Sequence, residues 1–281
     1  MSKRVKFLVF VVILVGAVRI TLFIFVPYKL ITGGYINDKF FYFLRSDTST
    51  YSTSYRDIKI FTYPEHNMFP DAWWESPVSG KVSPLLERDK ERAVRILKIA
   101  LDKYSKNVLD ENLRKVYLLG DLNFYGVAYG GTYYDKSVFM VIKSDLEGYT
   151  DAYVEKTFHH EFSSILFYKY KSDFDEEHWV GANALEFKYG NGGLEAIKSG
   201  NTSLKFDEQC NKLGLLNEYS KASVEEDFNE MEGNLFLSSK EFWEVVDKYD
   251  RIKKKIKLMI EFYNKIDPMF TEEYFRGLTG E

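Results

Sequence analysis

The sequence predicts an α+β fold, in which a small, mainly antiparallel sheet packs on a largely helical domain that follows an amino-terminal transmembrane helix. Short apolar segments bounded by turn residues are concentrated between residues 58 and 142 and indicate strands. Apolar residues at three- and four-residue spacing fill residues 85–104 and much of the chain after 150, and they indicate helices. With 281 residues, of which 45% are hydrophobic, the chain is long enough for one large domain or two small ones.

The first 30 residues carry a membrane signal. Residues 7–26 are apolar except for Arg19, and about 20 residues are needed to cross a bilayer as a helix. Lys3, Arg4 and Lys6 precede this segment, so the positive-inside rule places the amino terminus in the cytoplasm. We therefore expect residues 1–30 to anchor the chain in the cell membrane by a single pass, with its carboxyl-terminal domain extracytoplasmic. The alternative is a signal segment that is cleaved to release a secreted protein, although no A-x-A-like site follows it.

The charge argues against a nucleic-acid partner, and the cysteine content excludes a disulfide and a cysteine-based zinc site. The net charge is −4, but the first 30 residues hold five basic residues and no acidic ones, which leaves 33 basic against 42 acidic residues in the remainder. An acidic body argues against a nucleic-acid partner, which would favour a basic surface. Cys210 is the single cysteine, so neither an intramolecular disulfide nor a cysteine-based zinc site can form.

The elements before residue 105 are a tether, a strand, a loop and a helix. Residues 31–57, rich in Ser and Thr near their end, are expected to link the membrane segment to a domain over residues 58–281. Residues 58–63 alternate and predict a strand. Residues 69–84 predict a loop whose Trp73 and Trp74 either pack on the body as a lid or serve as a ligand platform. The apolar spacing of residues 85–104 predicts an amphipathic helix.

Further strands and then helices follow. Strands are predicted at 115–119, 124–129 and 137–142, with residues 130–136 as a hairpin-like connection. A helix capped by Thr150 or Asp151 should run to about residue 170, and a second should begin with Ser223 as its N-cap and Glu226 three residues later. Residues 190–202 predict loop, and later helices are expected at 239–265 and 271–278. The lysines of residues 251–257 are expected to form the solvated face of a helix.

The most informative local pattern lies in the first of these two helices. From His160 the sequence is H-E-x-x-S, one residue short of the H-E-x-x-H motif in which two histidines bind zinc and the Glu acts as general base. Residues 160 and 164 lie on one helical face about one turn apart. Ser164 therefore stands where the second histidine of the motif would be.

A candidate for a further zinc ligand follows in the next helix. Catalytic zinc usually has three protein ligands and one water, and residues 222–230 read A-S-V-E-E-D-F-N-E. From the sequence alone, Glu225, Glu226 or Glu230 could face His160, because an error of one residue in register changes the answer.

These two segments resemble the zinc-binding metallopeptidases that carry an H-E-F-x-H motif followed by E-D-F-A-E, a gluzincin-like family with exported and lipid-anchored members. The resemblance covers about residues 85–276. It implies a zincin-like domain in which His160 and Glu226 bind zinc and Glu161 is the general base. It also implies that Asp227 and Glu230 support the ligands.

The departure at Ser164 weakens or removes the zinc site that the resemblance implies. A neutral hydroxyl is a poor zinc ligand beside imidazole, which leaves His160 and Glu226 as the protein ligands. His159 could replace the missing imidazole only if the helix were distorted, because adjacent helical side chains diverge. His159 is otherwise expected to orient a neighbour or to pack beneath the motif.

Two functions remain open at this point. One is a membrane-tethered extracytoplasmic zinc metallopeptidase that acts on a peptide or protein substrate, if the site is active. The other is a catalytically inactive pseudo-peptidase that uses the cleft to bind a peptide, a glycan or a partner protein.

Overall fold

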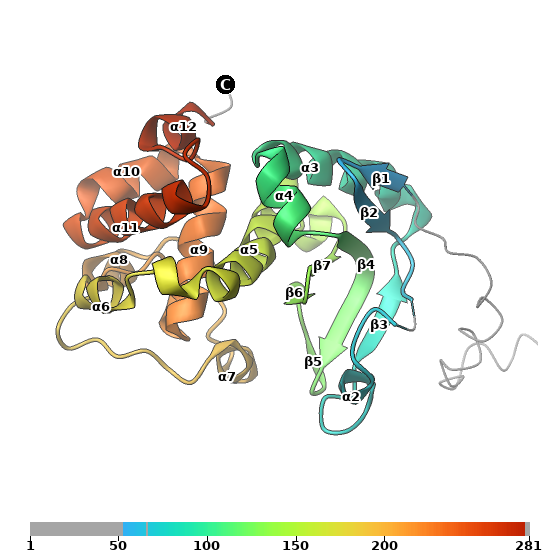
Figure 1. Ribbon diagram of the computed structural model, residues 1–281. Coiled ribbons are helices and arrows are strands. Elements are labelled where there is room, and N and C mark those ends of the chain that lie inside the picture. Colours follow the sequence, from blue (N-terminus) through green and yellow to red (C-terminus); the bar gives the residue numbers. More distant parts are fainter. Residues whose placement is uncertain (1–52, 66, 279–281) are drawn as a thin grey trace, which may run out of the picture. The chain divides into compact units, whose positions relative to one another are not determined.

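A long helix, α5 (Asp151–Lys169), lies between a sheet and a group of carboxyl-terminal helices, and it contacts both (Figure 1). The computed structural model describes residues 53–65 and 67–278, which fall in a compact unit from Ser49 to Glu281. The predicted membrane segment, residues 7–26, lies outside the described residues. Within the described part, no helix is both long and apolar enough to span a bilayer.

The sheet has seven strands and a parallel centre. Strands β2, β4 and β7 pair in parallel, and the other strands join them through antiparallel pairs in the order β1-β2-β4-β7-β6, with β3 and β5 paired to β4. The combination of helices with a sheet is thus as predicted, and most strand pairs are antiparallel, but the central strands β2, β4 and β7 are parallel. The strand bounds are Thr53–Tyr55, Ile58–Phe61, Lys81–Pro84, Lys115–Phe124, Val127–Ala128, Gly131–Tyr134 and Ser137–Val141 for β1 to β7.

Strand β7 and the first half of β4 are buried on both faces, which explains the apolar runs at residues 116–119 and 138–141. On β7, Val138 and Met140 join the larger core, which contains the helices, whereas Phe139 and Val141 join a smaller core on the opposite face. The smaller core is closed by the segment between β2 and β3. There Trp73 stacks edge-on against Phe124, with ring centroids 5.3 Å apart, so this Trp packs on the body, in agreement with the lid interpretation.

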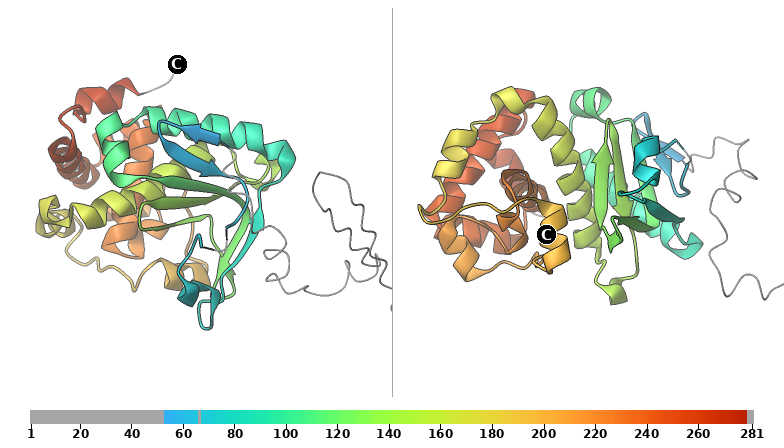
Figure 2. Two further views of the ribbon diagram at one scale, coloured as in Figure 1. Left: turned by 45° about the vertical axis from the view of Figure 1, so that its right-hand side comes forward. Right: turned by 90° about the horizontal axis from the view of Figure 1, so that it is seen from below.

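Helices from both halves of the chain contribute side chains to the larger core, and Figure 2 shows these helices from two further directions. The described helices and 3-10 turns are α2 Asp71–Trp74, η2 Glu87–Asp89, α3 Lys90–Asp102, α4 Lys106–Asn112, η3 Asp145–Glu147, α5, η4 Lys171–Asp173, α6 Glu176–Gly181, α7 Gly193–Ser199, α8 Glu208–Leu213, η5 Tyr219–Lys221, α9 Val224–Leu237, α10 Lys240–Lys248, α11 Asp250–Ile266 and α12 Glu272–Gly277.

Several predicted boundaries need correction. The strand predicted at 115–119 continues to Phe124, and the strand predicted at 124–129 is instead the end of β4, a turn and β5. The connection predicted over 130–136 contains β6, and β3 and α7 lie in segments that were predicted as loops. Residues Thr53–Tyr55, which the sequence assigned to the tether, form β1 because they pair with β2. The single helix predicted for 239–265 is two helices, α10 and α11.

The close approach of α5 and α9 depends on a glycine. A Cβ added at Gly233 of α9 would lie 2.8 Å from Lys156 Cγ and 3.2 Å from the Lys156 carbonyl oxygen on α5. Lys156 is itself buried, with 8% of its surface exposed, so its stem has little freedom to move away.

We expect Gly233→Val to destabilise the domain by about 1–3 kcal/mol, the usual cost of overpacking a closely packed contact. The matched control is Gly181→Val at the end of α6, where an added Cβ meets nothing within 4 Å, and it should change stability by less than about 0.5 kcal/mol. Urea denaturation of the two variants measures both effects. Equal stabilities would contradict the packing argument.

Candidate active site

The motif residues lie in the middle of α5, which Thr150 caps by accepting a hydrogen bond from the Tyr153 N–H. The helix is buried on most of its circumference, because Phe158, Phe162 and Leu166 pack in the larger core while His160 and Glu161 face a cleft. Rigid packing on both sides fixes the direction of the polar side chains at residues 160, 161 and 164.

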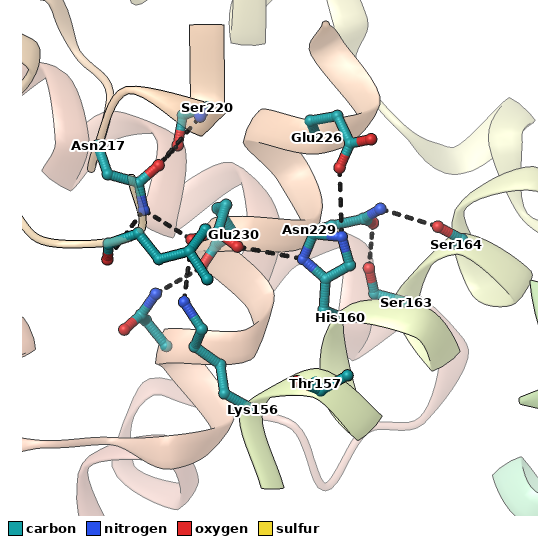
Figure 3. A network of polar contacts seen from close by, with 12 residues as sticks. Lys156, Thr157, His160, Ser163, Ser164, Asn217, Ser220, Glu226, Asn229 and Glu230 are labelled. Carbon is teal, nitrogen blue, oxygen red and sulfur yellow. Dashed lines mark hydrogen bonds and ion pairs between the residues drawn. The ribbon is translucent and has the colours of Figure 1, made fainter. Parts of the chain in front are cut away.

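His160 lies between two carboxylates of α9 (Figure 3). Its Nε2 is 3.2 Å from Glu226 Oε2, and its Nδ1 is 3.2 Å from Glu230 Oε1. Residues 226 and 230 are one turn apart, so both carboxylates project from one face of α9. The register that the sequence left open therefore brings two of its three glutamates to His160.

The charges of this group are balanced internally. Burial opposes the charged imidazole, but Glu226 and Glu230 outweigh it and hold the pKa of His160 well above its usual range. Burial also acts against the Glu230 carboxylate, yet the nearby Lys156 and His160 lower its pKa to about 2. Lys156 Nζ is 3.0 Å from Glu230 Oε2, and the Asn217 amide donates to the same oxygen at 2.6 Å.

The side chain of Glu161 forms no hydrogen bond or ion pair within residues 53–65 and 67–278. Its carboxyl lies against β6, where a Cβ added at Gly131 would be only 2.7 Å from Glu161 Oε1. Burial raises the pKa of this carboxyl to about 8, and the carboxylates of Glu226 and Glu225 add to the shift. Glu161 thus contributes to the lining of the cleft a carboxyl that has no partner among the described residues.

Ser164, in the position of the second histidine, is fully engaged with its neighbours. It is 1% exposed, accepts a hydrogen bond from Asn229 Nδ2 at 2.8 Å and donates to Glu225 Oε1 at 3.1 Å. Glu225 in turn accepts from the Tyr168 hydroxyl at 2.7 Å and the Tyr133 hydroxyl at 3.3 Å. The third glutamate of the sequence motif is therefore held on the Ser164 side of the site.

Two further candidate residues of the sequence analysis, His159 and Asp227, point away from His160. His159 is completely buried beneath the motif, where its Nδ1 is 2.9 Å from the Tyr104 hydroxyl, and burial lowers its pKa to about 4. Asp227 accepts hydrogen bonds from Trp179 Nε1 at 2.9 Å and Lys255 Nζ at 2.5 Å. Both side chains are buried and form hydrogen bonds in the core next to the site.

Lys255 corrects the prediction for the lysine-rich helix. Lys253, Lys254 and Lys257 are exposed as expected, but Lys255 is 0% exposed and pairs with the equally buried Asp227. Its position three residues after Ile252 and four before Met259 places it on the buried face of α11.

The cleft beside His160 has a volume of about 310 Å³. One wall comes from the segment that leads into β6, the floor from α5, and the other wall from the segment between α7 and α9. Its polar and aromatic lining includes Lys156, Thr157 and three tyrosines, Tyr129, Tyr153 and Tyr219. A Cβ added at Gly193, the first residue of α7, would collide with Glu226 Oε1 and lie 2.6 Å from the Tyr219 hydroxyl. Gly131 thus leaves space for the Glu161 carboxyl, and Gly193 leaves space for the Glu226 carboxyl.

Sequence reasoning did not identify Lys156, Tyr219 and Asn229 as residues of this site. Lys156 precedes His160 by one helical turn and Asn229 follows Glu226 by three residues, so helical spacing carried a signal for both. Tyr219 lies in η5, outside any periodic pattern, and only the folded chain brings it to the cleft.

Comparisons with known proteins agree with this architecture. Residues 114–267, more than half of the chain, match the family model described as "Putative zinc-binding metallo-peptidase". The chain therefore belongs to this family of zinc-binding metallopeptidases.

A solved structure from Bacteroides caccae ATCC 43185, which bears the same description, shares the fold with a TM-score of 0.51 at 17% identity. The alignment covers 79% of this chain and 84% of that one. No curated protein matches the chain.

The donor atoms at the site fall short of a catalytic zinc site with three protein ligands. His160 Nε2 and Glu226 Oε2 meet as two ligands would, and His160 is the ion-pair partner of this buried oxygen. The position of the second histidine in the H-E-x-x-H motif holds Ser164, whose hydroxyl proton is donated to Glu225. Among the described residues, no group of three His, Cys, Asp or Glu side chains is arranged to hold a metal ion.

The buried pair behind the site should be essential for stability. We expect Lys255→Met to destabilise the domain by about 3 kcal/mol or more, because it leaves Asp227 buried without its cation. Lys255→Met combined with Asp227→Asn should recover part of that loss, since the amide oxygen can still accept from Trp179. Chemical denaturation of the single and double variants tests this, and a double variant less stable than Lys255→Met would refute it.

Proposed function

We propose that this chain is a membrane-tethered, extracytoplasmic member of the metallopeptidase family that binds a peptide in its cleft without the zinc chemistry of a peptidase. The observation that carries the proposal is the state of Ser164, which occupies the second ligand position and has both hydrogen-bonding functions satisfied by Asn229 and Glu225. The membrane location rests on the sequence of residues 1–30.

The walls of the cleft favour an extended peptide as the ligand. Strand β6 is the last strand in the order of the sheet, and Gly131, in this strand, lines the cleft. A strand at a sheet edge can pair with an added extended segment through its main chain. Tyr129, Tyr153 and Tyr219 supply the aromatic surface that peptide side chains contact at recognition sites.

The free carboxyl of Glu161 favours a positively charged group on that peptide. The other carboxylates near His160 already have partners: Glu230 is held by Lys156 and Asn217, and Glu226 faces His160. Because its pKa is about 8, the Glu161 carboxyl is largely protonated at neutral pH in the free protein. An ammonium group beside it would favour the ionised form and supply the partner that the carboxyl lacks, and the tyrosine rings of the cleft also attract cations.

Zinc-dependent peptide hydrolysis is the second candidate. It is favoured by the 3.2 Å approach of His160 Nε2 to Glu226 Oε2, since these are the two zinc ligands that the family pattern retains here. Two protein ligands in place of three should make zinc binding weak, because even residues that only support the ligands contribute about 10–100-fold to affinity or activity.

Metal content separates the two candidates. We expect the full-length chain, purified in detergent without chelator, to contain well under one zinc per molecule by plasma mass spectrometry. The control is His160→Ala, which should contain the same background amount. One zinc per wild-type chain that disappears in the control would refute the metal-free proposal and favour the peptidase candidate.

Peptide binding tests the cleft itself. We expect hexapeptides with a central lysine to bind more tightly than the same peptides with norleucine, as measured by calorimetry. Glu161→Gln should abolish this difference, which we estimate at about 10-fold or more, because a hydrogen bond to a charged group contributes roughly 1.5–3 kcal/mol. Glu186→Gln, at an exposed position outside the cleft, is the matched control. Equal affinities for both peptide series would refute the cationic preference.

A further inference from the structure

The chain departs from the family pattern at two positions, and these two residues touch each other. Ser164 stands for the second histidine of H-E-F-x-H, and Asn229 stands for the alanine of E-D-F-A-E. They lie on different helices, yet Asn229 Nδ2 donates to Ser164 Oγ at 2.8 Å. One departure replaces a large side chain by a small one, and the other replaces a small side chain by a larger one.

The Asn229 amide bridges the two serines of α5. Its nitrogen donates to Ser164, and its oxygen accepts from Ser163 Oγ, as Figure 3 shows next to His160. Asn229 is 2% exposed, and the two serines are 0% and 1% exposed. Buried polar groups are costly unless they are paired, so the amide and the two hydroxyls form a matched set.

From this contact we infer that Asn229 closes the metal site: its amide fills the space that an imidazole at position 164 would need, so that the two departures compensate each other. The inference deepens the proposed metal-free function and rests on it. It also leads to a specific prediction. Zinc binding should return only when both positions are changed together.

Each single reversion should fail for its own physical reason. With Ser164→His alone, the imidazole would meet the Asn229 amide in a buried space, where overpacking forces side chains out of their preferred rotamers. With Asn229→Ala alone, the hydroxyls of Ser163 and Ser164 would lose a partner, and a small cavity would form. In the double variant the imidazole can occupy the vacated space one turn after His160 on the same face of α5.

Glu225 would support the restored ligand. It lies 3.1 Å from Ser164 Oγ and is fixed by the hydroxyls of Tyr168 and Tyr133. Histidines that bind metals commonly donate their second ring N–H to a carboxylate, which sets the tautomer and the ring orientation. Glu225 is placed to accept that hydrogen bond from an imidazole at position 164.

The test compares five full-length proteins: wild type, Ser164→His, Asn229→Ala, Ser164→His with Asn229→Ala, and Ser164→His with Asn234→Ala. Asn234 is another buried asparagine of α9, and its amide donates to the Glu230 carbonyl oxygen. The measurements are zinc per chain after dialysis, zinc affinity by competition with a chelator, and the melting temperature with and without zinc. None of them requires peptidase activity.

We expect only the Ser164→His, Asn229→Ala protein to retain about one zinc per chain and to melt at a higher temperature when zinc is added. Its zinc affinity should exceed that of Ser164→His by about 100-fold or more, since a ligand is restored rather than a supporting residue. Equal affinities for these two proteins, or a folded double variant without zinc, would overturn the inference while leaving the metal-free function intact. Zinc already bound at one per chain in the wild type would overturn the proposed function, and with it the inference.

A second set of variants tests the inference if the Ser164→His, Asn229→Ala protein does not fold. Ser164→Ala, Asn229→Ala and their combination remove atoms only and avoid overpacking. If the two side chains form a matched pair, the combined loss in melting temperature should be clearly smaller than the sum of the single losses. Additive losses would show that the positions are independent and would overturn the inference.

Discussion

The packing of α5 against α9 is the constraint on which the rest of the structure depends. These two helices carry His160 and the glutamates that surround it, and the glycine at 233 lets their backbones approach across the Lys156 side chain. This contact places His160 between two carboxylates and brings Ser164 to Asn229. The sheet and α3 support α5 from the other side, so the motif helix cannot shift without disturbing the larger core.

Electrostatic balance explains how so many charged groups coexist in a partly closed space. Lys156 and His160 provide positive charge beside Glu230 and Glu226. The Asn217 amide donates to Glu230, and two tyrosine hydroxyls donate to Glu225. The site can therefore be stable through its own side chains. This arrangement supports the metal-free function that we propose.

The sequence by itself determined the local elements whose signals are short-range. The caps at Thr150 and Ser223, the helices that they begin, and the helical face shared by residues 160 and 164 follow from residue types and spacing, and the structure has them. The uninterrupted apolar runs of β4 and β7 also carried the signal of strands buried on both faces. Their parallel pairing was missed, because it depends on long connections that no turn motif marks.

Only the tertiary structure decided which side chains meet. The register of α9 against α5 directs residues 226 and 230 toward His160 and turns Asp227, about 100° further around the helix, toward Lys255. The same packing buries a lysine within an exposed basic run and joins two motif departures that lie 65 residues apart. Such pairings arise from the geometry of two helices in contact, and local spacing within either helix contains no information about the other.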